Sequence, residues 1–359
     1  MKKLLLASVA VSGLALASAP AYADIDLDVG GYFKGYGVFV DQDETAGTSV
    51  NDFDIIRDTE LHISGETTLD NGLTVGAHFE LDVDGADNTA TDESYAYFSG
   101  NWGRVNVGAE DGAGYLLQVA APSADSNVDG IRQYVQPFNA TGNIGTGVQG
   151  LDYDMDPTGK DDKLTYLSPI VNGFQAGVTY TPDSNATTGG AADDLEGAGT
   201  ETTTDGVGDE AYELAVRYEG QFDQVGVIAG AGFAHVENNS ATATQDDRDA
   251  WNVGLDLDVS AFGIGAAYME DSTFVDNADV ETLVVGGDYT TGPFKIGVSY
   301  LNQDSDAAAS SEYDRYTGGV VYEYGPGMSF RGSLQFTDVD NSTTDADGTA
   351  VILGTQVNF

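Results

Sequence analysis

The chain has 359 residues and carries 59 acidic side chains against 13 basic ones, which gives a formal net charge of −46 at pH 7. A surface this negative repels nucleic acid and attracts cations, so the composition excludes a nucleic-acid partner. The 19 Tyr and 15 Phe exclude a disordered acidic chain, and the absence of Cys excludes a fold held by disulfides.

The first 23 residues predict a secretory signal peptide. Two lysines precede an apolar run from Leu4 to about Ala17, and the tripeptide AYA at 21–23 has the small-residue pattern of a cleavage site. The run is too short for a membrane anchor, and no later segment approaches the ~20 apolar residues of a spanning helix. We therefore expect export, removal of residues 1–23, and a single domain over 24–359.

Beyond this segment the hydrophobic pattern has a period of two, which predicts β-strands with one apolar and one polar face. Near the start, Leu27, Val29, Phe33 and Phe39 share one face, while Lys34 belongs to the other. Similar apolar rows recur along the chain, at 73–83, 212–218, 251–257, 294–300 and 330–336. About sixteen such segments can be counted, and no convincing amphipathic helix interrupts them.

The connections between these segments alternate between short and long. The short turns lie at 69–72, 100–103, 168–173, 220–224, 260–263, 290–293 and 325–327. The long acidic connections lie at 41–52, 84–92, 110–161, 182–208, 237–248, 270–280, 302–312 and 338–349. This alternation predicts an all-β fold, a transmembrane antiparallel β-barrel of about 16 strands with its long loops outside.

The apolar faces are expected to point outward. Sixteen strands would enclose a cavity that inward apolar side chains could not fill, whereas an outward apolar face meets lipid and a polar face lines water. Tyrosines near the row ends suit the two membrane interfaces, namely Tyr180, Tyr212, Tyr218, Tyr268, Tyr289, Tyr300, Tyr322 and Tyr324. In the segment 225–236 both faces are apolar or glycine, which indicates either an oligomer contact or room for a loop.

The last residues, TAVILGTQVNF, also alternate. Val351, Leu353, Val357 and Phe359 share the face expected to meet lipid, and Ile352 is an exception on the polar side. We expect this strand to pair with the first one, from about residue 26 to 40, because pairing removes both open edges of the sheet.

Three segments are similar to Gram-negative trimeric porins, and most of all to the alphaproteobacterial, Rhodobacter-like branch: SGETTLDNGLTVGAHFELD (64–82), DESYAYFSGNWGRVNVGAEDG (92–112) and DKLTYLSPIVNGFQAGVTYTP (162–182). The resemblance implies a homotrimer of sixteen-stranded barrels among the lipid and lipopolysaccharide of the outer membrane, passing small hydrophilic solutes by diffusion. It also implies that the third external loop, here 110–161, folds into the lumen. Finally, it implies that the assembly machinery recognises the terminal strand through Phe359.

The charged residues of the lumen predict a constriction with opposed charges. Strand parity places seven basic residues on the water-facing wall: Lys34, Arg104, Lys163, Arg217, Lys295, Arg315 and Arg331. Facing them across a narrow aqueous gap we expect acids of the inserted loop, among them Glu110, Asp111, Asp125 and Asp129. Arg132 with Tyr134 and Phe138 is expected to pack this loop against the wall.

The wall itself is also acidic. Many general porins carry arginines that face the loop on the second and fifth strands, whereas this sequence has Glu60 and Ala109–Glu110 near those positions. Inward parity on the second and third strands adds Asp58, Glu66, Glu80 and Asp82. We therefore predict a channel that prefers cations.

No cofactor is required by the sequence, although calcium is a candidate ligand. Asp152, Asp154 and Asp156 have the spacing of a calcium loop, but the late Gly159 and Lys163 at the glutamate position break the pattern. His62 and His78 should meet across the hairpin at 69–72, both facing water. With Glu60 and Glu80 nearby they are candidates for a metal or acid–base site, but two histidines without a third ligand favour the interpretation as polar lining of the lumen.

Two other functional classes remain open as alternatives. A sugar-selective channel would need a series of aromatic side chains through the lumen, and Tyr32, Tyr36 and Trp102 are too few to predict one. An enzyme on a barrel would need a catalytic constellation near the rim, for which His235 is the one suited histidine. Because nucleophile-elbow, HExxH and phosphate-loop motifs are all missing from the sequence, we do not expect an enzyme.

Overall fold

The structure is a computed structural model. It describes residues 25–44, 47, 49–84, 90–139, 151–184, 208–240, 242, 245–275, 278–306, 311–341 and 344–359. The expected signal peptide, 1–23, lies outside these residues. Within these ranges, no helix has both the length and the apolar character needed to cross a membrane.

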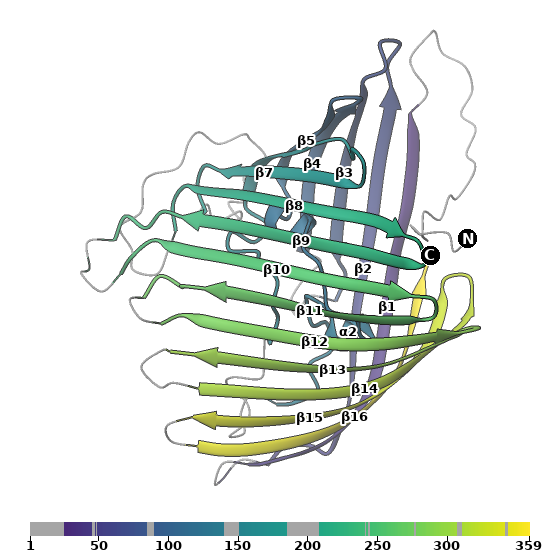
Figure 1. Cartoon of the computed structure of the whole chain (residues 1–359), viewed down its shortest axis with the longest axis vertical. Coiled ribbons are helices and arrows are strands. Elements are labelled where there is room, and N and C mark those ends of the chain that lie inside the picture. Colours follow the sequence, from purple (N-terminus) through teal and green to yellow (C-terminus); the bar gives the residue numbers. More distant parts are fainter. Residues whose placement is uncertain are drawn as a thin grey trace.

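Sixteen strands follow one another along the chain. They are β1 (Asp26–Gln42), β2 (Phe53–Thr68), β3 (Thr74–Asp82), β4 (Ala90–Gly100), β5 (Gly103–Ala109), β6 (Asp162–Leu167), β7 (Phe174–Thr181), β8 (Ala211–Phe222), β9 (Val225–Val236), β10 (Arg248–Val259), β11 (Phe262–Asp271), β12 (Val280–Thr291), β13 (Phe294–Ser305), β14 (Ser311–Gly325), β15 (Met328–Asn341) and β16 (Thr344–Asn358). Each pairs antiparallel with its sequence neighbours, and β1 pairs with β16, so the sheet is a closed barrel (Figure 1). The predicted fold class is confirmed.

The seam of the barrel lies where the sequence places it. Phe39 pairs with Val351 and Lys34 with Gln356. Beyond the last paired residue, the Phe359 backbone N–H donates to the Gly31 carbonyl at 3.1 Å, and the Gly31 N–H donates to the Phe359 carbonyl at 3.0 Å. The terminal residue therefore belongs to the sheet, and closure leaves no open strand edge for lipid to desolvate.

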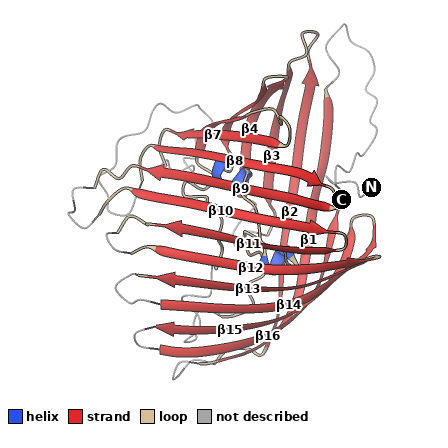
Figure 2. Cartoon of the chain, viewed as in Figure 1, coloured by secondary structure: helices blue, strands red, loops and turns tan. Residues whose placement is uncertain are grey.

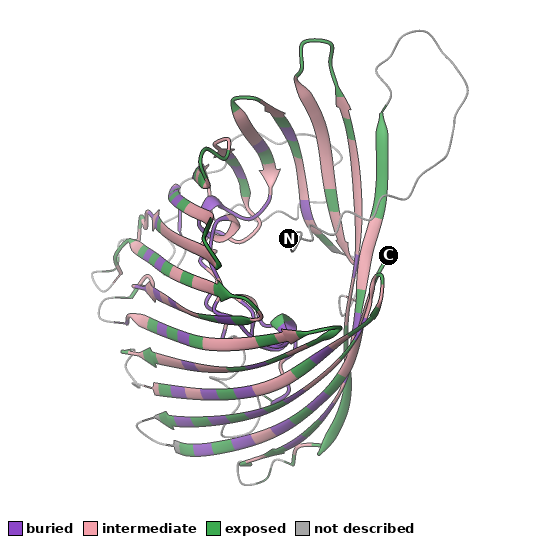
Figure 3. Cartoon of the chain, turned by 45° about the vertical axis from the view of Figure 1, so that its right-hand side comes forward, coloured by how far each residue is buried: buried purple, intermediate pink, exposed green. Residues whose placement is uncertain are grey.

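Burial alternates along the strands, as the period of two requires (Figure 3). Ile55 and Val298 are 73% and 65% exposed on the outer face, whereas Val284 and Ile352 are buried on the inner face. An outer face this apolar is suited to lipid. The inner face carries most of the buried polar side chains.

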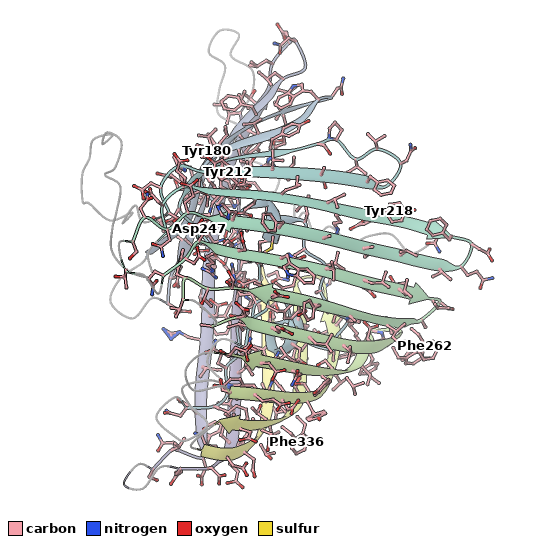
Figure 4. The ribbon with its side chains drawn as sticks, turned by 60° about the vertical axis from the view of Figure 1, so that its left-hand side comes forward. Tyr180, Tyr212, Tyr218, Asp247, Phe262 and Phe336 are labelled. Carbon is pink, nitrogen blue, oxygen red and sulfur yellow. The ribbon has the colours of Figure 1, made fainter. Side chains whose placement is uncertain are left out.

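Aromatic side chains stack in pairs near both ends of the barrel. Tyr180 and Tyr212 lie near the loop end, with ring centroids 5.2 Å apart. Phe262 lies with Tyr289 at the opposite end, near the short turns, at 4.8 Å. Figure 4 shows Tyr180 and Tyr212 close together and far from Tyr218 and Phe262. The two rows have the placement expected for aromatic girdles at the membrane interfaces.

One expected loop is mostly strand. The stretch 338–349 was predicted as a connection because it is acidic, yet β15 extends to Asn341 and β16 begins at Thr344. Val339 and Ala346 pair with each other and are buried inside, while Asp338, Asp340, Asp345 and Asp347 are exposed. The alternation thus continues past the apolar band, where outward carboxylates can be solvated. The strands β13 and β14 shorten the expected loop 302–312 in the same way.

Candidate functional site

The longest connection, 110–161, folds into the barrel as expected. It contains two four-residue helices, α1 (Ala113–Leu116) and α2 (Ser126–Asp129), which lie within the ring of strands (Figure 2). The Ala113 N–H donates to Thr179 Oγ1 at 2.9 Å and the Gly114 N–H to Glu213 Oε2 at 2.8 Å. Because these acceptors belong to β7 and β8, the loop is fixed to the wall from its first turn. Residues 140–150 of the loop lie outside the described residues.

The next part of the loop, residues 117–124, lies flush against a track of inward-facing glycines. A Cβ at Gly230 would lie 2.8 Å from Val119 Cγ2, and one at Gly297 would lie 2.6 Å from the Ala124 nitrogen. The other members of the track are Gly254, Gly265 and Gly286. Real side chains cannot approach so closely, so glycine is required for the loop backbone to reach the wall. The ambiguous segment 225–236 is thereby explained as room for a loop.

The helix α2 is held by two ion pairs with the far strands. Arg331 on β15 donates to Asp125 Oδ1 at 2.5 Å, and the Tyr36 hydroxyl donates to the other Asp125 oxygen at 3.1 Å. Arg315 on β14 lies 3.3 Å from Asp129 Oδ1 and donates to Gln133 Oε1 at 2.9 Å. These charge-assisted contacts bring the loop against the wall.

This arrangement differs from the expected opposition of charges across an aqueous gap. Arg315 and Asp129 are 1% and 6% exposed and in direct contact. Glu110 and Asp111 are also buried. The difference has a steric cause, because the glycine track lets the loop backbone approach until acid and base touch. Asp125 and Asp129 of the loop therefore pair directly with wall arginines instead of facing them across water.

The other wall cations divide into covered and uncovered ones. Lys163 donates to the Glu110 carbonyl at 2.6 Å, and Arg217 to the Gln118 carbonyl at 2.8 Å. Lys34 binds Asp58 at 2.9 Å under the ring of Tyr134, whose centroid is 3.2 Å away. The described part of the loop forms no ion pair with the remaining two: Arg104 donates to Asn106 Oδ1 at 2.6 Å, and Lys295 pairs with Asp288 at 3.3 Å near the short turns.

Arg132 joins the loop to itself. Its guanidinium binds Asp154 at 2.9 Å, Asp156 at 3.0 Å and Asp111 at 3.3 Å. The expectation that Arg132 packs against the wall is therefore wrong, whereas Tyr134 does pack there, on Lys34. Phe138, the third member of that group, is buried in the main core cluster.

Lys160 ties the returning part of the loop to the wall. It binds Glu93 on β4 at 2.5 Å and Asp111 at 2.6 Å. The pKa of this lysine is raised overall. Burial alone would lower the pKa, but the nearby carboxylates of Asp111 and Glu93 outweigh the effect of burial. Sequence reasoning missed Lys160 because parity says nothing about a residue outside the strands.

The three carboxylates with calcium-loop spacing have other partners. Asp154 and Asp156 are bound by the Arg132 guanidinium, and Asp152 accepts from the Gln133 N–H. Burial raises the pKa of the Asp152 carboxyl to about 6, and burial with the nearby Asp111 raises that of Asp156. Among the described residues these three do not form a group that could hold a metal ion. Their arrangement does not fit calcium. A calcium site at this position is supported by the sequence spacing alone.

The wall formed by β2, β3 and β4 carries a second group of ionisable side chains, which are buried or half-buried. The side chains of Glu60, Glu80 and His62 are 11%, 18% and 32% exposed. His78 lies beside His62, with ring centroids 5.8 Å apart, and the two histidines meet across the hairpin as expected.

Asp92 on β4 joins this group through a β-bulge. Glu80 pairs with Glu93 but Leu81 pairs with Thr91, so Asp92 is the extra residue of the bulge. One oxygen each of Glu60, Glu80 and Asp92 lies within 4.8 Å of the others. Strand parity could not have found Asp92, because a bulge re-aims its side chain.

Comparison with known proteins supports one family. A family model described as Gram-negative porin matches residues 7–342. An uncharacterised protein of Rickettsia conorii is 24% identical over 333 residues, covering 80% of this chain and 71% of that protein. The anion-selective porin from Comamonas acidovorans has a TM-score of 0.67 at 17% identity, covering 94% of this chain and 100% of that one. A mutant of the Rh. blastica porin has a TM-score of 0.57 at 18% identity, and the match covers 93% of this chain and 100% of that one.

Proposed function

Because the chain belongs to the Gram-negative porin family, whose family model covers residues 7–342, we propose that this outer-membrane channel passes small hydrophilic solutes by diffusion and prefers cations. The resemblance found in the sequence is confirmed by this match. The preference for cations goes further and is argued from the charges of the lumen. The anion-selective porin of Comamonas acidovorans is similar in fold, which does not decide the charge preference of this chain.

One observation carries the preference for cations. The inserted loop forms ion pairs with Arg315 and Arg331 on the far wall. Among the described residues, Glu60 and Glu80 on β2 and β3 have only histidines as ion-pair partners, so no lysine or arginine offsets their charge. A lumen wall whose carboxylates are not offset by basic side chains concentrates cations along the channel.

Reversal potentials in planar bilayers test this preference. In a gradient of potassium chloride, the purified protein is expected to show the sign that corresponds to potassium permeation. The double variant Glu60→Gln with Glu80→Gln should lower the ratio of cation to anion permeability, because it removes two charges from the lumen. The control is Asp247→Asn, a change at the outer rim, which should alter the ratio much less. A preference of the unmodified protein for chloride would contradict the proposal.

We also propose that the channel is a trimer whose subunits meet at β5–β7. These strands have only 7, 6 and 8 residues. At ~3.3 Å per residue and a tilt of ~40°, they rise about 15–20 Å, less than the ~25 Å apolar band of such barrels. Their outward side chains are nevertheless apolar, with Val107 and Leu164 47% and 49% exposed. A neighbouring subunit would cover this short side of the barrel.

A further inference from the structure

Two histidines and three carboxylates gather at one point on the lumen wall. The β2–β3 pairing sets His62 opposite Glu80 and Ser64 opposite His78, so that these side chains share the inner face. One ligand atom each of His62, His78 and Glu80 lies within 4.8 Å of the others. The proposed channel function uses the negative charge here but has no need for paired imidazoles.

The distances around Glu80 suit a small tetrahedral ion. Glu80 Oε1 is 2.8 Å from His78 Nε2 and 3.4 Å from His62 Nδ1. Zinc–nitrogen and zinc–oxygen bonds of ~2.0–2.1 Å in a tetrahedron set neighbouring ligand atoms ~3.3 Å apart. The contact of Glu80 with His62 already has this spacing. The contact with His78 reaches it when the two atoms move apart by about half an ångström.

The second nitrogen of each imidazole lies near an oxygen, and that of His78 is hydrogen-bonded. His78 Nδ1 lies 2.6 Å from Ser64 Oγ, and His62 Nε2 lies 3.5 Å from Glu60 Oε2. Histidines that bind a metal through one ring nitrogen characteristically direct the other toward a hydroxyl or carboxylate, which fixes ring orientation and raises basicity. Here the outer nitrogen of His78 has such a partner, while that of His62 makes no hydrogen bond and lies only within ion-pair distance of Glu60. The two inner nitrogens face the same Glu80 oxygen.

The surrounding charge favours a cation, and the ligand types select its class. Glu60, Glu80 and Asp92 approach within 4.8 Å, so their repulsion falls when a divalent ion binds. Calcium and magnesium prefer sites made of oxygen ligands alone, whereas paired imidazoles with a carboxylate suit zinc and its neighbours in the transition series.

We propose that His62, His78 and Glu80 bind one divalent transition-metal ion of the zinc type on the lumen wall, with Ser64 and Glu60 as positioning residues. The bound ion adds positive charge where the lumen is most acidic, so its occupancy lowers cation conductance. This second consequence rests on the proposed channel function, whereas binding itself does not.

Calorimetric titration of the folded protein in detergent with zinc chloride tests the site directly. The unmodified protein should bind one ion, and His62→Ala and His78→Ala should each weaken binding by at least about tenfold. Ser64→Ala should weaken it by roughly 10- to 100-fold if Ser64 orients His78. The control is His235→Ala, because His235 lies near Asp249 at 2.7 Å but outside the cluster, and it should leave the affinity unchanged.

Three results of the titration would overturn the site. They are the absence of zinc binding, an affinity in both histidine variants equal to that of the unmodified protein, and displacement of zinc by equimolar calcium, which would assign binding to the carboxylates alone. Far-UV circular dichroism establishes that each variant retains its sheet, and His78→Gln supplies a second, less disruptive variant.

Conductance measured with and without zinc separates this proposal from the channel proposal. Zinc should reduce potassium current through the unmodified protein, a chelator should restore it, and His78→Gln should be insensitive. Zinc binding without an effect on current would overturn the proposed effect on conductance but leave the site standing. A protein that binds zinc but shows no channel at all would instead contradict the proposed function.

Discussion

At the scale of single residues, the buried contact between Arg315 and Asp129 decides where the loop sits. Arg315 is 1% exposed, and Asp129 also accepts from the hydroxyls of Thr317 and Ser299. Removing one partner of a buried ion pair costs ~3–5 kcal/mol, because the other charge is left without compensation. We predict that Asp129→Ala detaches α2 from the wall while the barrel remains closed, since the strand ladder is unchanged.

Limited trypsin digestion measures this detachment, because Arg132 lies directly after α2. Cleavage at Arg132 should become faster in Asp129→Ala than in the unmodified protein. The double variant Asp129→Ala with Arg315→Met should recover part of the protection, since it no longer buries an unpaired guanidinium. Equal cleavage rates in all three proteins would mean that this ion pair does not hold the loop.

At the scale of elements, the glycine track sets the distance between loop and wall. A Cβ at Gly286 would collide with the Pro122 carbonyl oxygen, which is backbone and cannot move aside alone. We predict that Gly286→Ala pushes residues 117–124 toward the lumen axis and lowers single-channel conductance. Conductance in potassium chloride is the measurement.

The matched control for the track is Gly318 on β14. A Cβ there meets only Val298 Cγ1 at 3.8 Å, which is an ordinary contact. Gly318→Ala should therefore leave conductance unchanged. If the two alanine variants conduct alike, the loop is not held at contact distance by the track.

The elements also show what the sequence could predict. The barrel, its seam and the inward direction of Lys34 and Arg315 follow from a period of two, which depends only on neighbouring residues along a strand. The inward direction of Asp92 could not be predicted, because a bulge interrupts that period. The ion-pair partners of Arg132 and Lys160 could not be predicted, because they depend on how the loop folds back and no local sequence pattern encodes that. The prediction of a loop at 338–349 was wrong, because the acidic composition of this stretch hides the alternation of inward and outward residues that continues through it.

At the scale of the whole molecule, the barrel has one short side, formed by β5–β7 with 7, 6 and 8 residues. On β5–β7 the outward apolar side chains cannot span the apolar band, and we predict that a second subunit covers them. Leu164→Arg, on β6, should therefore convert the proposed trimer to monomers on native electrophoresis. Val298→Arg, on the longer β13, is the matched control, because Val298 is 65% exposed and faces lipid in this arrangement. The control should remain trimeric and lose ~2–4 kcal/mol of stability, the cost of arginine in the bilayer. Dissociation by Val298→Arg but not by Leu164→Arg would place the subunit contact on the other side of the barrel.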